Sequence, residues 1–270
     1  MKNTIPLSED EKIKRTIRKK TIISFSVFIF AISLGIIGWK WFLQQPADEG
    51  VLKPLRKALN TNEKVNAIFF SENHLAPEYP KSKAVKKARV NGNIGMGADF
   101  DTLNWKLFIK PHPENTNKNS EFKLTMHHIK SLPKRDVIFE FHCIEGWSEI
   151  SHWGGVRFLD FLKKYHLGTH SGKDPDPKHP EDLYKYVGLM TPDSMYYVGI
   201  DMKSMLHDQT LLCYELNEKP LPMDQGYPLR LIITVKYGVK SLKRIGAIYF
   251  SDTRPPDYWF EQGYDYDAAL

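Results

Sequence analysis

An uncharged run near the N-terminus constrains this chain more than any other feature. Residues 21–39 read TIISFSVFIFAISLGIIGW and contain no charged side chain. A helix needs about 20 consecutive apolar residues to cross the hydrocarbon core of a bilayer, and Trp39 and Trp41 stand where an interfacial aromatic belt is expected. No small-residue cleavage pattern follows the run, which favours a retained anchor over a cleaved signal peptide or a buried soluble helix. We therefore predict one transmembrane segment over residues 21–43.

Positive charge is denser before this segment than after it. The basic residues within ten positions before it are Lys12, Lys14, Arg15, Arg18, Lys19 and Lys20, and those that follow are Lys40, Lys53, Arg56 and Lys57. Because cytoplasmic flanks carry the excess of Lys and Arg, we expect a single-pass protein of the inner membrane with a cytoplasmic N-terminus and a periplasmic domain. Much of the formal net charge of +6 lies in this basic head, so the charge is no argument for a nucleic-acid partner.

The pattern of residues divides the chain into a basic head (1–20), an anchor (21–43), a stalk (44–85) and one domain (86–270). Within the domain, alternating stretches such as DVIFEFHC and IGAIYF predict short strands, and VRFLDFLKKYH has helical spacing. The segment IEGWSEISHWGG, with its glycines and tryptophans, is expected to be a loop. Many short strands and few long helices favour an α+β fold.

One of only two cysteines lies at the end of a predicted strand. Alternation places Val137, Phe139, Phe141 and Cys143 on one face of DVIFEFHC. A lone cysteine in this position is more often a small buried hydrophobe than a functional thiol, but this strand opens into a polar loop, where sites are commonly built. A disulfide with Cys213 and a nucleophilic role beside a histidine stay open as alternatives.

The residues around this cysteine form a recognisable motif. Cys143, Glu145, Trp147 and Ser148 give C-x-E-x-W-S, and a W-x-G-V pattern follows. Further along come YVGLMT, YPLRLIITVKYGVKSLKRI and RPPDYW. Over residues 88–260 the chain resembles the molybdopterin-binding domain of the sulfite-oxidase superfamily. That domain is shared by sulfite oxidases, plant-type nitrate reductases and the periplasmic methionine-sulfoxide reductase catalytic subunit, whose compact layout is the most similar. The resemblance implies a mixed-sheet domain.

The resemblance assigns roles to individual residues. It implies that the Cys143 thiolate is the protein ligand to molybdenum, a soft donor suited to such a centre, and that Cys143 and Glu145 serve catalysis. It implies cofactor contacts from Thr191, Gln225, Arg230, Ser241, Leu242, Lys243, Arg89 and Asn91. The pterin carries a phosphate, for which the cations Lys236, Lys240, Lys243 and Arg244 offer an anion site; a solvated basic turn is the alternative reading.

The resemblance also implies an activity. We expect a molybdenum-cofactor oxidoreductase that carries out two-electron oxygen-atom transfer and reduces an S- or N-oxide, small or protein-borne, such as methionine sulfoxide. Sulfite-type oxidation at the same site, a tethered binding module without the metal, and a cysteine hydrolase are the alternatives. Electrons would be exchanged with a membrane haem or quinone-linked partner, and a monomer is expected. The segment RTIRKK lacks the twin-arginine motif that exported enzymes with this cofactor usually carry, which leaves the export route open.

Overall fold

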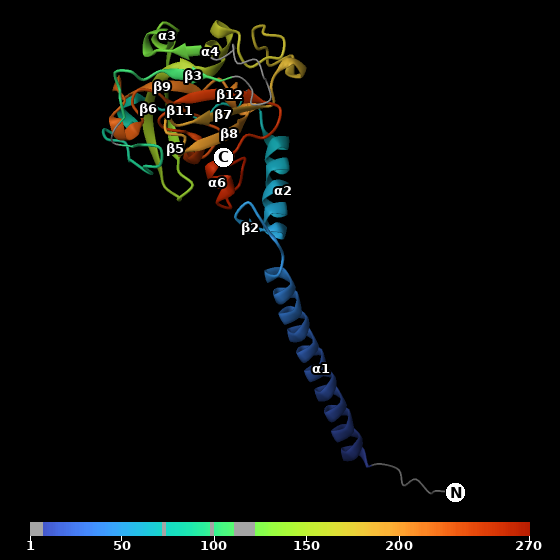
Figure 1. Ribbon diagram of the computed structural model, residues 1–270. Helices are drawn as coiled ribbons and strands as arrows, with labels where there is room; N and C mark the ends of the chain where they lie inside the picture. The colour runs from blue at the N-terminus through green and yellow to red at the C-terminus, as the bar shows by residue number, and fades with distance from the viewer. Residues whose placement is uncertain (1–7, 72–73, 98–99, 111–121) are drawn as a thin grey trace.

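A computed structural model describes residues 8–71, 74–97, 100–110 and 122–270 of the chain. Helix α1 (Glu9–Leu43) has 35 residues and is about 50 Å long. Its N-terminus is closed by a capping box between Ser8 and Glu11. None of its residues is buried, and it is long and apolar enough to cross a membrane. It projects from the domain as one rod (Figure 1) that contains both the predicted anchor and most of the basic head.

A small hairpin and a second helix join this rod to the domain. Strands β1 (Ala47–Asp48) and β2 (Val51–Leu52) pair antiparallel and lead into α2 (Lys53–Phe69), which has Pro54 in its first turn. Beyond α2, the Tyr79 N–H donates to the Ile138 carbonyl and the Val85 N–H to the Ile150 carbonyl. The segment predicted as a stalk therefore lies along the domain in its described parts (Figure 1).

The first large sheet carries the predicted cysteine strand. It contains β5 (Lys134–His142), β6 (Ser148–Arg157), β9 (Leu211–Leu216) and β10 (Lys219–Pro220), with β11 (Arg230–Ile232) paired to β9. All its pairs are antiparallel. Strands β5 and β6 form a hairpin with nine residue pairs.

The prediction of a loop at IEGWSEISHWGG is wrong from Ser148 onward, because these residues belong to β6. Strand β9 passes so close to Gly155 that a Cβ there would lie 2.3 Å from the Leu212 carbonyl oxygen. The glycine is thus required by a close backbone approach within a sheet. The register shifts between Gly154 and Gly155, and the predicted helix begins at Phe158, directly after the strand ends.

The second large sheet is mixed. Its order is β4 (Phe122–Leu124), β3 (Leu107–Ile109), β12 (Ala247–Ser251), β7 (Tyr186–Met190) and β8 (Tyr197–Asp201), and β12 pairs parallel with β3 but antiparallel with β7. The remaining α-helices are α3 (Met126–Lys130), α4 (Phe158–Tyr165), α5 (Met202–Met205) and α6 (Tyr258–Glu261). Short 3-10 helices cover Lys81–Lys83, Pro180–Asp182, Met223–Gln225 and Gly238–Lys240.

The main core lies where α4 meets both sheets. Phe158, Phe161 and Leu162 of α4 are fully buried with Leu189 of β7 and Leu231 of β11. The predicted α+β fold with a mixed sheet is confirmed. The ends of β5 and of β11 come together outside this core, and there the candidate site is formed.

Candidate active site

Cys143 begins the turn that joins β5 to β6. The Cys143 N–H donates to the Trp147 carbonyl at 2.9 Å, and the Gly146 N–H donates to the Cys143 carbonyl at 3.0 Å. These bonds fix the backbone on both sides of the thiol. The side chain is 7% exposed, and Asn91 Nδ2 lies 3.5 Å from its sulfur. Phe141 and Cys143 line the same cavity, as the predicted alternation requires.

This cofactor cavity has a volume of about 190 Å³. Segments that lie far apart in the sequence supply its walls: residues 89–94, 141–149, 225–243 and 259–264. Eight of the ten predicted site residues line it, namely Arg89, Asn91, Cys143, Glu145, Gln225, Arg230, Ser241 and Lys243. The fold therefore gathers in one place residues that span more than half of the chain.

Two predicted site residues lie outside the lining. Leu242 is fully buried in the core, and its carbonyl accepts from the Leu231 N–H. Thr191 is 1% exposed, and its hydroxyl donates to Asp193 at 2.6 Å. A Cβ on Gly95 would meet the Thr191 side chain, so Thr191 supports the loop that carries Asn91.

Arg230 is the buried cation of the cavity. Its Nη1 donates to Gln225 Oε1 at 2.8 Å, and its guanidinium stacks over the Trp153 ring at 4.6 Å. Burial lowers the pKa of this guanidinium to about 10. Its Nε has no hydrogen-bond partner in the described part of the chain. Because this cation also lines a cavity, its free donor can bind an acceptor on a molecule held there.

Ser241 and Lys243 extend this anion-binding wall. The Ser241 hydroxyl is buried and also lacks a partner among the described residues. Burial, and then the neighbouring charge of Arg230, lower the pKa of Lys243 to about 8. A phosphate in the cavity would accept from both unpartnered groups and would favour the charged form of Lys243. The donors present thus fit the phosphate-bearing pterin.

The other predicted cations serve the fold. Lys236 pairs with Asp201 and Asp267. The Lys240 ammonium lies 2.5 Å from Asp257, and both side chains are 2% exposed. The prediction of one four-cation phosphate site is therefore wrong for Lys236 and Lys240, because neighbouring carboxylates already neutralise them. Arg244 Nε donates to the Tyr227 carbonyl, and its guanidinium covers the Phe100 ring.

The rim of the cavity combines a carboxylate with aromatic rings. Glu145 is exposed and accepts from Trp147 Nε1 at 3.3 Å. The Arg89 guanidinium lies 4.7 Å from the Trp147 ring, and Glu149 accepts from the Arg89 backbone N–H. The mouth thus offers both an exposed carboxylate and flat apolar surfaces.

Three aromatic side chains that line the cavity were not predicted from the sequence. Tyr196, Trp259 and Tyr264 line the cavity, and burial raises the pKa of Tyr196, whose hydroxyl donates to the Val239 carbonyl at 2.6 Å. Only Trp259 had a sequence signal, since it ends the RPPDYW motif. Tyr196 and Tyr264 enter through tertiary packing, which no local pattern encodes.

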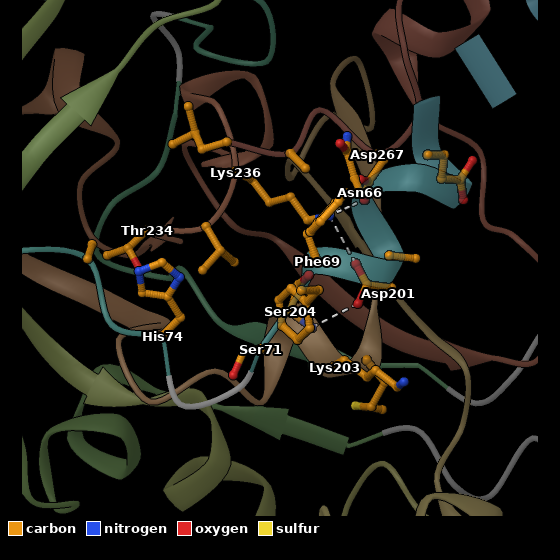
Figure 2. A pocket seen from close by; sticks show the side chains of 18 of the residues that line it. Asn66, Phe69, Ser71, His74, Asp201, Lys203, Ser204, Thr234, Lys236 and Asp267 are labelled. Carbon is orange, nitrogen blue, oxygen red and sulfur yellow. Dashed lines mark hydrogen bonds and ion pairs between the residues drawn. The ribbon is translucent and has the colours of Figure 1, made fainter. Parts of the chain in front are cut away.

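A larger cavity of about 790 Å³ lies on the other side of β5. Successive side chains face opposite cavities here: Glu140 and His142 line the larger one, whereas Phe141 and Cys143 line the cofactor cavity. Figure 2 shows Lys236 held between Asp201 and Asp267 in this larger cavity. None of the ten predicted site residues lines it.

No group of three or more His, Cys, Asp or Glu side chains converges in the described segments. The cofactor cavity instead offers one thiol beside an anion-binding wall. This is the arrangement suited to a metal whose remaining ligands come from an anionic organic cofactor.

Comparison with known proteins identifies the family. Residues 95–259 match the family described as the oxidoreductase molybdopterin binding domain, and the match covers more than half of the chain. The chain belongs to this family. It is an oxidoreductase whose cofactor is molybdopterin with molybdenum, as the motifs predicted.

Two of the curated relatives match more than three quarters of the chain. The putative protein-methionine-sulfoxide reductase subunit YedZ1 of Azospira oryzae is 31% identical over 221 residues, which are 81% of this chain and 77% of that protein. The protein-methionine-sulfoxide reductase catalytic subunit MsrP of Campylobacter jejuni is 28% identical over 226 residues, which are 77% of this chain and 70% of that protein. Among solved structures, sulfane dehydrogenase SoxCD from Paracoccus pantotrophus matches with a TM-score of 0.46 and 15% identity, over 68% of this chain and 46% of that chain.

Proposed function

We propose that this protein is a membrane-anchored, molybdenum-dependent reductase of S-oxides, with protein-bound methionine sulfoxide as the leading substrate. The observation that carries the proposal is the meeting of the Cys143 thiol with two unpartnered buried donors, Arg230 Nε and Ser241 Oγ, in one cavity. The names of both curated relatives support the choice of substrate. Sulfite oxidation remains the competing activity of the same site.

Different residues of the cavity would hold the metal and the pterin. Cys143 would hold the metal, with Asn91 placed beside its sulfur. Arg230, Ser241 and Lys243 would hold the phosphate, and Gln225 orients Arg230 through its amide oxygen. When bound, the molybdenum cofactor supplies two-electron oxygen-atom transfer. Arg89 and Trp147 form a rim that would orient the incoming sulfoxide.

The reaction consumes two electrons and two protons for each sulfoxide, and it releases the thioether and one water. Glu145 is the proposed group that passes protons to the departing oxygen, because it is exposed to solvent at the rim. The electrons come from a membrane haem or quinone-linked partner. We further propose that the chain acts as a monomer, with the N-terminus cytoplasmic and the domain periplasmic, in line with the excess of basic residues before the anchor.

Metal content and substrate choice test the proposal together. Protein from a host that makes the cofactor should contain about one molybdenum per chain by mass spectrometry and should reduce methionine sulfoxide with dithionite-reduced methyl viologen. The same preparation should be assayed for sulfite oxidation with ferricyanide. A folded protein without molybdenum would favour the binding module, and turnover of sulfite alone would favour the oxidase.

A further inference from the structure

A short connection joins the membrane helix to the domain. Helix α1 ends at Leu43 and β1 begins at Ala47, so only residues 44–46, here called the tether, lie between them. Four Cα–Cα steps span at most about 14 Å. The β1–β2 hairpin is therefore held within that distance of the end of α1, where Trp39 and Trp41 are typical of a membrane interface.

The hairpin and α2 are in turn fixed to the C-terminal part of the domain. Arg56 of α2 is 2% exposed. Its guanidinium donates to the carbonyls of Glu49, Phe260 and Tyr264 at 2.6, 2.9 and 2.8 Å. Gly50 has a φ of +76°, and a Cβ there would lie 2.7 Å from the backbone of the 262–263 segment. The hairpin therefore packs directly on the turn that follows α6.

The same segment forms a wall of the cofactor cavity. Trp259 and Tyr264 line that cavity, and their rings pack edge to face with centroids 5.1 Å apart. Arg56 thus bonds the backbone of a residue whose side chain faces the cofactor site. Figure 1 shows α6 and the β5–β6 turn at the end of the domain nearest α1, with α3 and α4 at the opposite end.

We propose that the cofactor cavity works at the membrane surface, where the tether and Arg56 hold one side of its rim, formed by Trp259, Tyr264 and Ile144, against a membrane-embedded redox protein. This inference rests on the proposed function. The partner gives up two electrons, the sulfoxide takes them up with two protons, and thioether and water leave. Trp259, Tyr264 and Ile144 are the docking surface for the electron donor, and the sulfoxide enters beside Arg89 and Trp147.

Two properties of the rim favour an integral membrane protein as its occupant. Tyr264 is 42% exposed and Ile144 38% exposed, so the rim presents uncovered aromatic and apolar surface of the kind that partner proteins cover. A tether of three residues also keeps the rim beside the bilayer. A lipid surface alone carries no electrons, whereas a membrane-embedded redox protein lies at the level at which the tether holds this part of the domain.

The test separates electron delivery from catalysis. About 20 Gly/Ser residues are inserted between Gln45 and Pro46, which adds a flexible span of roughly 25 Å. Sulfoxide reduction is then driven in two ways: by dithionite-reduced methyl viologen in detergent, and by NADH through the respiratory chain in membranes of the cell that makes the protein. Viologen-driven rates should stay equal. The NADH-driven rate should fall roughly 20-fold, because effective concentration falls with tether length to the power of about −3/2.

Two further variants control this result. The same insertion after Gly172, in an exposed loop where a Cβ added to this glycine would meet no atom within 4 Å, should leave both rates unchanged. Gly50→Val should lower the NADH-driven rate more than the viologen-driven rate, because its side chain lifts the hairpin off the α6 turn without lengthening the tether. An unchanged NADH-driven rate in the tether variant overturns the inference. Absence of viologen-driven activity in the unaltered protein instead overturns the proposed function.

A spectroscopic measurement tests the geometry without turnover. A nitroxide on Gln262→Cys, in protein embedded in lipid nanodiscs, should be broadened by a nickel-chelating lipid. The same label on Lys164→Cys, on α4 at the opposite end of the domain, should not be. Both native cysteines are buried and should stay unlabelled. Equal broadening at the two sites, or none at Gln262→Cys, contradicts a membrane-facing rim.

Discussion

The two cavities on either side of β5 differ in how their polar groups are satisfied. In the larger one, beside α2, Lys236 is neutralised by Asp201 and Asp267, and the one unpartnered buried side-chain atom among the described lining residues is the Ser204 hydroxyl. In the smaller one, Arg230 and Ser241 each keep a free donor on the same wall. Because buried polar groups are normally paired, it is a buried cation with an unpartnered donor, and not the volume, that distinguishes the cofactor cavity from the larger one.

The largest expected effect is the difference in turnover between replacing Cys143 and replacing Cys213. Cys143→Ser should lower the turnover number for sulfoxide by more than about 100-fold, since even outer groups around a metal cost 10–100-fold when removed. Stopped assays and molybdenum content per chain measure it. Cys213→Ser is the matched control, because a hydroxyl can make the bonds that the buried Cys213 thiol makes to the carbonyls of Gly154 and Glu215. Equal losses in the two variants would sink the assignment of Cys143.

The second prediction concerns the larger cavity. Lys236→Met should lower the free energy of unfolding by about 3 kcal/mol, near the low end for breaking a buried ion pair, because Asp201 is partly exposed. Denaturant unfolding measures this loss. Molybdenum content and turnover per folded chain should not change. A loss of cofactor in the folded variant would show that Lys236 contributes to the cofactor site.

The loss in Lys236→Met should depend on pH. Burial raises the pKa of Asp201, but the charge of Lys236 and the bonds from Ser204 outweigh it, so the net pKa is lowered. A lowered carboxyl pKa contributes stability above the unfolded value of about 4, and this stability is lost as the pH falls through the folded value. The difference between the two proteins should therefore be greatest at neutral pH and shrink below about pH 4.

Local sequence was sufficient for the parts of the site that one motif contains. The alternation in β5 placed Phe141 and Cys143 on one face, and the C-x-E-x-W-S motif located the rim. Local sequence was insufficient where the role of a residue depends on which distant side chain contacts it. Lys236 and Lys243 look alike in sequence. Lys236 pairs with carboxylates from distant segments, whereas Lys243 lines the cofactor cavity. Likewise, Gly155 resembles a loop glycine until β9 is seen to pack against it.

The third prediction weakens the anion wall without removing its charge. Arg230→Lys keeps the cation but loses the planar contact with Trp153 and the bond to Gln225. We expect molybdenum and pterin content to fall by about tenfold, with the chain still folded. Arg157→Lys, whose side chain pairs with Asp160 and Asp208 outside the cofactor cavity, should keep full cofactor content. Full loading of Arg230→Lys would show that the guanidinium is dispensable.

The smallest expected effect is a change in the pH dependence of anion binding. Folding lowers the pKa of Lys243 to about 8, so this side chain loses its charge as the pH rises from 7 to 9. An anion that needs the charged form should bind up to roughly tenfold more weakly at pH 9 than at pH 7. Calorimetric titration of the apoprotein with sulfate, whose own charge is constant over this range, measures the change. In Lys243→Arg the affinity should be nearly flat, because guanidinium stays protonated. A wild-type affinity that is equally flat would place Lys243 outside the anion site and leave Arg230 and Ser241 to hold the phosphate.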